Sequence, residues 1–211
     1  MPTATSQVTF SSRDPAVPQL AGRLRLPEPG QTPAGACVVC APHPVFGGHM
    51  DVWLLPRISE ALAERGWLAL RFDFAPRPDA DGTAETADLA GALDYCDDLV
   101  PQVPRRAIVG WSFGALVGLL HGLTDPRVTD WVAIAPPTRP VEGVPLAPTP
   151  FAAAAGWSAR RTILVGSEDR YFPPRTVKAF EPDRVVVVEG ADHFFFDQDA
   201  EVARHVVEAL R

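Results

Sequence analysis

The sequence contains little cysteine, no cluster of basic residues and no apolar leader at its start. Its 211 residues include 3 cysteines and carry a formal net charge of -7. This acidic balance argues against nucleic acid or an anionic membrane as the main partner, because both attract clustered Lys and Arg. Residues 1–10 contain neither a basic region nor an apolar one, so we expect no secretory signal and a cytoplasmic location.

A Cys-x-x-Cys pair at Cys37 and Cys40 invites a redox or metal-binding interpretation. The pair lies in an apolar run over residues 36–41 that is typical of a buried strand. Successive side chains alternate between the two faces of a strand, so a spacing of three places these thiols on opposite faces. We therefore interpret both cysteines as small buried residues and expect no metal site.

The stretch over residues 107–124 resembles a membrane span, because it carries no formal charge and has a glycine at every fourth position. A Trp-Ser pair and His121 interrupt it. Glycines at this spacing also allow a helix to lie close to a sheet. We therefore predict no membrane-spanning segment and no membrane partner.

Apolar strand-like runs alternate with helical patterns along the chain, which is typical of a parallel sheet covered on both faces. We expect a single α/β domain over residues 1–211, with a mostly parallel sheet of seven or eight strands. The expected strands cover residues 7–10, 19–26, 36–40, 67–72, 106–109, 128–134, 161–165 and 184–188. The expected helices cover residues 51–65, residues 83–99 with Thr83 as N-cap, a segment that starts at Phe113, and residues 200–210.

Two proline-rich segments are expected to be loops. Residues 75–82 are rich in Pro and Asp. Residues 136–156 contain six prolines and join two core strands, so this insertion could form a lid or a pocket wall. The sheet edge near residues 7–26 could pair with a second copy, which leaves a homodimer open.

The segment Gly110-Trp111-Ser112-Phe113-Gly114 joins an apolar run to a helical pattern. A strand-to-helix turn this tight strains the serine backbone and leaves space only for small residues two positions away on each side. The hydroxyl is then presented at a helix N-terminus, which favours developing negative charge. Ser112 is therefore the candidate nucleophile. The same Gly-Trp-Ser tripeptide ends at Ser158, but Arg160 fills a position that must be small, so we reject Ser158.

A serine nucleophile needs a base, and the base needs a carboxylate that orients it. After such a turn the expected chain order is carboxylate, then histidine. His193 follows the last expected strand and is the candidate base, whereas His121 and His205 fall within expected helices. Asp169 follows the preceding strand and is the candidate carboxylate. The alternatives for the carboxylate are Glu168 and Asp192.

The oxyanion of acyl transfer needs two backbone N–H donors. Phe113, directly after the nucleophile, should supply one. The loop after residues 36–40 should supply the other; because Pro44 has no N–H, Val45 is the best candidate and Phe46 the second. We interpret His43 as a residue that shapes this loop, with the role of a base as the alternative. The expected pocket residues are Phe46, Trp111, Phe113, Phe194 and the insertion over residues 136–156.

From about residue 36 onward these motifs resemble the α/β-hydrolase superfamily, within it the small bacterial dienelactone-hydrolase-like proteins. The resemblance rests on Pro42-His43-Pro44-Val45-Phe46-Gly47-Gly48, the turn at Ser112, Gly-x-x-Asp-x-x-x-Pro at Asp169 and Asp-His-Phe-Phe at His193. It implies a Ser-Asp-His triad, an acyl-enzyme intermediate, no cofactor and little or no cap. Relatives often carry Arg-Gly-x-Gly-x-Ser where this chain has residues 74–79, so the pocket wall there should differ.

The residues and the resemblance together predict a cofactor-free serine hydrolase that cleaves a small carboxylic ester or thioester. Its expected partner is the small-molecule acyl substrate. Two alternatives stay open: a non-hydrolytic enzyme of the same fold, such as a lyase or perhydrolase, and a binding protein that keeps the fold without turnover.

Overall fold

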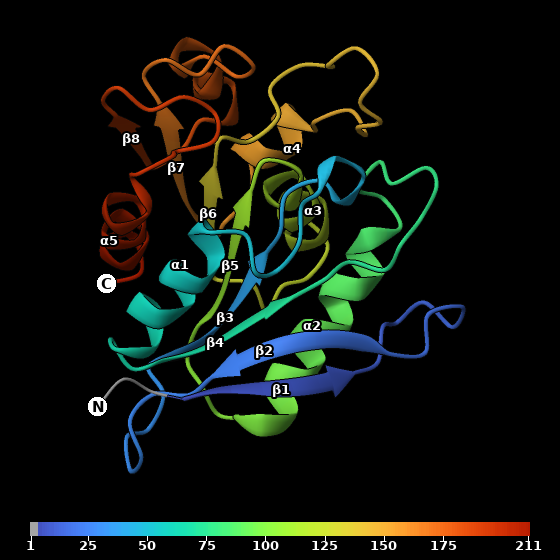
Figure 1. The fold of residues 1–211 in the computed structure, drawn as a ribbon, viewed down its shortest axis with the longest axis vertical. Coiled ribbons are helices and arrows are strands. Elements are labelled where there is room, and N and C mark those ends of the chain that lie inside the picture. The colour runs from blue at the N-terminus through green and yellow to red at the C-terminus, as the bar shows by residue number, and fades with distance from the viewer. Residues whose placement is uncertain (1–3) are drawn as a thin grey trace.

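A computed structural model describes residues 4–211, so the first three residues of the expected 1–211 domain lie outside the described part. Its centre is an 8-stranded sheet in the order β1-β2-β4-β3-β5-β6-β7-β8 (Figure 1). The strands are β1 Thr5–Phe10, β2 Leu20–Arg25, β3 Gly35–Cys40, β4 Trp67–Phe72, β5 Arg106–Trp111, β6 Asp130–Ile134, β7 Arg160–Gly166 and β8 Arg184–Val188. The first two strands pair antiparallel and the rest run parallel to one another, which confirms the predicted sheet.

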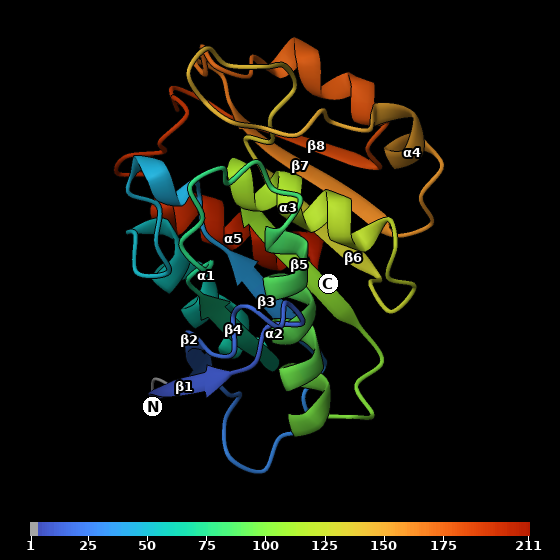
Figure 2. The same cartoon turned by 90° about the vertical axis from the view of Figure 1, so that its right-hand side faces the viewer.

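Helices cover both faces of this sheet (Figure 2). They are α1 Leu54–Ala63, α2 Glu85–Leu99, α3 Phe113–Gly122, α4 Phe151–Ala155 and α5 Asp199–Ala209, with two 3-10 segments, η1 Pro44–Phe46 and η2 Pro174–Phe180. α1 and α5 pack together on one face, while α2 and α3 pack together on the other. The parallel strands are therefore enclosed on both sides, as their continuous apolar runs predict.

Strand β3 illustrates how the two core layers form, because all its residues are buried. Val38 and Cys40 belong to the layer under α2 and α3, whereas Cys37 and Val39 belong to the layer under α1 and α5. The two cysteines are free thiols on opposite faces, as predicted. Burial raises the pKa of both thiols, which favours their protonated, unreactive form.

The structure differs from the sequence prediction in several elements, and helix α1, expected over residues 51–65, covers only Leu54–Ala63. Thr83 is not the N-cap of α2: the cap position is Ala84, without a side-chain bond, and the Thr83 hydroxyl contacts the Asp81 carboxylate instead. The insertion over residues 136–156 is not all loop, since its four consecutive alanines form most of helix α4. Strand β6 begins at Asp130 rather than two residues earlier, because Val128 N–H closes a turn onto Asp125 O at 3.2 Å.

The uncharged stretch over residues 107–124 divides into β5 and α3. Within residues 4–211, no helix combines the length and the apolar character needed to cross a membrane. The glycines of residues 107–124 allow close packing instead. A Cβ at position 118, for example, would lie 2.7 Å from Ile108 Cγ2. Helix α3 can therefore lie directly against the sheet.

The parallel arrangement places the loops after β3, β5, β7 and β8 at one edge of the sheet. Figure 1 shows this edge at the top of the molecule, above the arrowheads of the parallel strands. Ligands of open α/β sheets bind at this carboxyl edge. The candidate triad residues Ser112, Asp169 and His193 lie in these loops, and the other candidate residues lie in or next to the elements that border them.

Candidate active site

The turn at Ser112 lies between β5 and α3 and has the strain that its sequence predicts. Ser112 has φ 52° and ψ -111°, an unusual conformation for a residue with a side chain. Its N–H donates to Ile134 O of the neighbouring strand at 2.8 Å, which fixes the turn. A Cβ at position 110 would lie 2.3 Å from Gly114 O, and one at position 114 would lie 2.5 Å from Cys40 O. Only glycine fits at the positions two residues before and two residues after this serine.

Three of the predicted residues lie within hydrogen-bonding distance of one another. His193 Nε2 is 3.1 Å from Ser112 Oγ, and His193 Nδ1 is 2.9 Å from Asp169 Oδ2. A carboxylate accepts only, so Nδ1 carries the proton and Nε2 is left to accept from the serine hydroxyl. This tautomer is the one that a general base requires.

Asp169 is fixed by the loop after β7. Its second oxygen, Oδ1, accepts the N–H groups of Tyr171 at 2.8 Å and Phe172 at 2.9 Å, and the side chain is fully buried. Of the alternatives, Glu168 is exposed, and Asp192 accepts the N–H groups of Phe194 and Phe195 within its own loop. Neither alternative is bonded to the His193 ring.

Two indole groups hold the loop that carries His193. Trp111 Nε1 donates to His193 O and Trp53 Nε1 donates to Phe194 O, each at 3.2 Å. Trp111 is the residue directly before the serine, so the nucleophile turn and the histidine loop are connected by a hydrogen bond. The sequence prediction placed Trp111 in the pocket and missed this bond, which no sequence spacing indicates.

The loop after β3 is organised by His43. This residue is the N-cap of η1: its Nδ1 accepts Val45 N–H at 3.2 Å, and its backbone O accepts Phe46 N–H at 3.1 Å. The two alternatives for the oxyanion donor of this loop, Val45 N–H and Phe46 N–H, are therefore both engaged inside the loop. Phe113 is the first residue of α3, where an N–H has no intrahelical partner.

The other ring nitrogen of His43 connects this loop to the insertion. Nε2 lies 3.3 Å from Pro145 O, so it carries the proton and the ring is neutral. Burial lowers the pKa of His43, which favours the same neutral form. His43 also packs 4.5 Å from the Phe113 ring, measured between centroids. These contacts suit a residue that shapes the loop.

A pocket of about 410 Å³ opens beside Ser112 and His193. The predicted residues Phe46, Trp111, Phe113 and Phe194 line it, as do Val141, Glu142, Val144 and Leu146 of the insertion. The sequence prediction missed Val52, Trp53, Tyr171 and Phe172, because their neighbours in sequence give no sign that they face the same space. Among the described residues that line it, Glu142 is the one with a formal charge.

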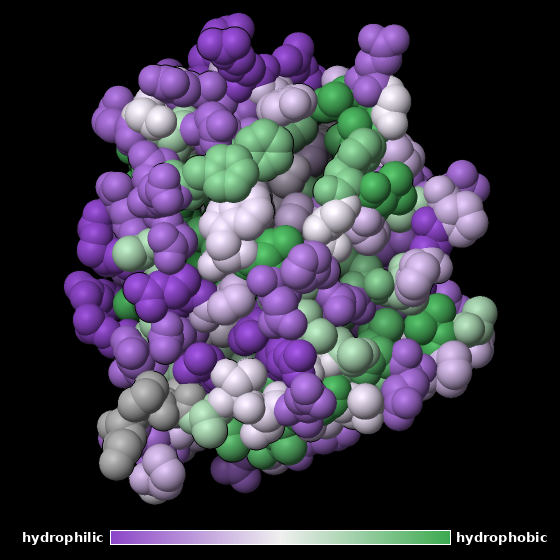
Figure 3. Space-filling view, in the orientation of Figure 1, coloured by the Kyte–Doolittle hydropathy of each residue, from purple (hydrophilic) through white to green (hydrophobic). Residues whose placement is uncertain are grey.

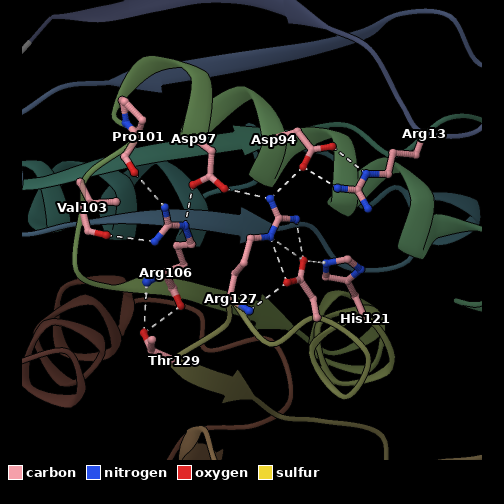
Figure 4. A network of polar contacts seen from close by, with 10 residues as sticks. Arg13, Asp94, Asp97, Pro101, Val103, Arg106, His121, Arg127 and Thr129 are labelled. Atoms are coloured by element: carbon pink, nitrogen blue, oxygen red, sulfur yellow. Dashed lines mark hydrogen bonds and ion pairs between the residues drawn. The ribbon is translucent and has the colours of Figure 1, made fainter.

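The other histidines after the serine lie elsewhere. His121 Nε2 is 3.1 Å from Asp125 Oδ2, and Arg127 binds that carboxylate together with those of Asp94 and Asp97 (Figure 4). His205 contacts Glu208 on the surface of α5. No group of three or more His, Cys, Asp or Glu side chains in residues 4–211 is arranged to hold a metal ion.

Comparison with known proteins identifies the fold of the chain. An alpha-beta serine hydrolase homologue from Coxiella burnetii is 27% identical, with a TM-score of 0.80 over 100% of this chain and 99% of that one. The chain is a member of the α/β-hydrolase superfamily. A lidless a/b serine hydrolase from Xanthomonas campestris, 23% identical, matches this α/β-hydrolase fold with a TM-score of 0.79 over 100% and 95% of the two chains.

Sequence comparison alone is less informative for this α/β hydrolase. An uncharacterized protein of Rickettsia prowazekii, RP471, is 24% identical over 187 residues, which cover 84% of this chain and 79% of that protein. No protein-family model matches the chain. The residues at the carboxyl edge of the sheet are therefore the main guide to function.

Proposed function

We propose that the protein is a serine hydrolase that cleaves a small carboxylic ester or thioester through an acyl-enzyme intermediate. The observation that carries this proposal is the 3.1 Å approach of His193 Nε2 to Ser112 Oγ at the wall of an apolar pocket. The bond from His193 Nδ1 to Asp169 supports it further, because it fixes the base in its accepting tautomer. Two matched structures are described as a serine hydrolase or a serine hydrolase homologue, which agrees with this reaction class.

The proposed reaction proceeds in two halves. Ser112 Oγ attacks the carbonyl carbon while His193 Nε2 takes its proton, and His193 then gives that proton to the departing alcohol or thiol. Asp169 holds the imidazole and stabilises its charged form. Water, activated by the same histidine, then hydrolyses the acyl-Ser112 ester. The side chains supply every proton transfer, so the proposal includes no cofactor.

The oxyanion needs two N–H donors near the serine. We assign the first to Phe113, at the N-terminus of α3, where the helix dipole also favours negative charge. Val45 stays the proposed second donor. Its N–H bonds His43 Nδ1 in the described structure, so it would have to turn from that ring toward the oxyanion. Loss of one such donor typically lowers turnover by about 10²–10³.

Several parts of the sequence prediction stay predictions. They are the organisation as one domain, the cytoplasmic location and the homodimer. The acyl substrate as a small-molecule partner is part of the proposal, and the pocket of about 410 Å³ lies within the range of small-molecule sites. Val141, Val144 and Leu146 of the insertion over residues 136–156 line the pocket, and a role of this segment as a lid stays a prediction.

A fluorophosphonate probe tests the proposal, because it reacts covalently with serines that a base activates. We expect the native protein to be labelled and Ser112→Ala to be unlabelled. Ser158→Ala is the matched control, since this serine follows the same Gly-Trp dipeptide, and it should label like the native protein. Equal labelling of Ser112→Ala would refute the nucleophile. A folded native protein that neither labels nor hydrolyses short acyl esters and thioesters would instead be a binding protein.

A further inference from the structure

Three aromatic side chains form a continuous exposed strip beside the pocket. The Trp53 and Phe196 rings stack with centroids 4.7 Å apart and an interplanar angle of 21°. The Phe196 and Phe194 rings stack at 5.7 Å and 28°. Exposed fractions are 40% for Trp53, 38% for Phe194 and 58% for Phe196. We call these three residues the aromatic strip. Figure 3 shows hydrophobic side chains in the upper half of the molecule, at the level where the parallel strands end, and others toward its lower right.

The backbone holds this strip outward at an energetic cost. Phe195, between the two exposed phenylalanines, is fully buried and has φ 53°, and Asp197 has φ 62°. Positive φ values are unfavourable for residues with side chains and persist only where the surroundings enforce them. The bond from Trp53 Nε1 to Phe194 O is one such restraint. The loop therefore directs Phe194 and Phe196 to the surface while it anchors itself through Phe195.

The strip is continuous with the pocket that contains Ser112. Trp53 and Phe194 line that pocket, and Phe196 extends the same surface outside it. The strip also lies on one particular side of the site, since the Phe194 ring is 5.5 Å from the His193 ring. In the proposed reaction His193 delivers the proton to the departing group, so the departing group must lie on the histidine side of Ser112.

We propose that the aromatic strip binds the alcohol arm of the ester, and that this arm is an uncharged planar aromatic group. Planar rings match a row of stacked aromatic side chains. No Lys or Arg is among the described residues that line the pocket, and Glu142 is the lining residue with a formal charge. The pocket therefore does not favour an anionic alcohol arm. This inference rests on the proposed function and adds the chemical class of the leaving alcohol.

Substitution of Phe196 tests the strip without touching Ser112, His193 or Asp169. Phe196→Ser is compared with the native protein on three esters: 2-naphthylmethyl acetate, methyl acetate and methyl 2-naphthoate. The two acetates form the same acetyl-enzyme, so the ratio of their kcat/KM values isolates the alcohol arm. We expect this ratio to fall roughly threefold to tenfold, the worth of one aromatic contact. Methyl 2-naphthoate, with the ring on its acyl arm, should be unaffected.

Leu99→Ser is the matched control, because Leu99 is a similarly exposed apolar residue at the end of α2, outside the pocket. It should leave all three kcat/KM values at native levels. Loss on methyl 2-naphthoate instead of the naphthylmethyl ester would overturn the assignment to the alcohol arm. An unchanged acetate ratio would overturn the strip as a subsite. Sedimentation of native protein and Phe196→Ser distinguishes a further occupant: if only the oligomeric state changes, the strip binds a second copy of the chain.

The failure of this inference is distinguishable from failure of the proposed function. Fluorophosphonate labelling of Phe196→Ser at Ser112 reports the nucleophile and does not depend on an aromatic alcohol. Labelled protein with an unchanged acetate ratio refutes the strip alone. Binding of intact 2-naphthylmethyl acetate to Ser112→Ala, measured by quenching of tryptophan fluorescence, tests the aromatic strip without turnover. Phe196→Ser in the same background should weaken this binding by the same threefold to tenfold.

Discussion

Residues 4–211 contain two histidine–aspartate pairs with a buried carboxylate, one at the carboxyl edge of the sheet and one near its opposite edge. His193 and Asp169 lie at the carboxyl edge with ring and carboxylate atoms 2.9 Å apart. His121 and Asp125 lie near the opposite edge, at the end of α3, with the corresponding atoms 3.1 Å apart. The two pairs are nearly equal in local geometry, so the pair alone cannot be what makes a site.

The difference lies in what surrounds each pair. Asp169 accepts two backbone N–H groups and pairs with no Lys or Arg among the described residues, and the second nitrogen of His193 faces Ser112. Asp125 is bound by the Arg127 guanidinium, and its histidine faces no nucleophile among the described residues. A base needs a carboxylate that stabilises its positive charge. Because Arg127 already neutralises Asp125, the second pair is suited to structure.

The strongest test of this comparison exchanges each aspartate for asparagine. We expect Asp169→Asn to lower kcat for ester hydrolysis by about 10⁴-fold, because the amide no longer fixes the imidazole in its accepting tautomer. Asp125→Asn should leave kcat unchanged and lower the free energy of unfolding by about 1–3 kcal/mol, since a bond to a charged group is lost. Steady-state kinetics and urea unfolding of both variants provide the measurement. Similar kcat losses in both would contradict the distinction.

A smaller effect is expected from the indole that connects the serine turn to the histidine loop. Trp111→Phe keeps an aromatic ring but removes the N–H that donates to His193 O. We expect kcat to fall roughly threefold to tenfold, because a hydrogen bond of about 1 kcal/mol no longer positions the base. The rate of fluorophosphonate labelling should fall by the same factor.

Trp131→Phe is the control for this indole. It removes a similar bond, from Trp131 Nε1 to Ala115 O at 3.1 Å, in the core beneath α3. We expect it to lower stability without lowering kcat or the labelling rate. Equal kinetic losses in the two variants would mean that Trp111 acts only through general stability.

Much of this arrangement could be predicted from the sequence because it follows from short-range rules. Continuous apolar runs indicated the parallel strands, and Gly110 and Gly114 indicated the turn at Ser112. Chain order then selected Asp169 and His193 by elimination, and the structure places both within hydrogen-bonding distance of each other. His121 was excluded by its position inside a helix, which needs no tertiary information.

The remaining features depend on contacts between distant segments. The bond from His43 to Pro145 joins residues that are 102 positions apart. The aromatic strip brings Trp53 together with a loop near the C-terminus, 141 residues away. Thr83 was a reasonable N-cap by residue type, but a nearby carboxylate, Asp81, competes for its hydroxyl. This competition is local, between residues two positions apart, and residue type alone did not predict which partner the hydroxyl takes.

The smallest expected effect on activity comes from the structural pair. In the folded protein burial opposes ionisation of Asp125, but the hydrogen bonds from Arg127 outweigh it and lower its pKa from 3.8 to about 2. A carboxyl group with a lowered pKa stabilises the fold above its unfolded value, near pH 4, and this stability is lost as pH falls toward 2. Without Arg127 only burial and weaker partners act, so the pKa should rise and acid unfolding should begin at higher pH.

Arg127→Met therefore should lower the free energy of unfolding at pH 7 by about 2 kcal/mol, since three carboxylates lose a shared cation. The acid-unfolding midpoint, followed by circular dichroism, should move upward in pH, while kcat at pH 7 stays native. Arg204→Met on the surface of α5 is the control; its exposed pair with Glu208 should contribute less than about 1 kcal/mol. The carboxylates that Arg127 binds, those of Asp94, Asp97 and Asp125, do not line the pocket. A drop in kcat as large as that of Asp169→Asn would therefore show that the two edges of the sheet are coupled.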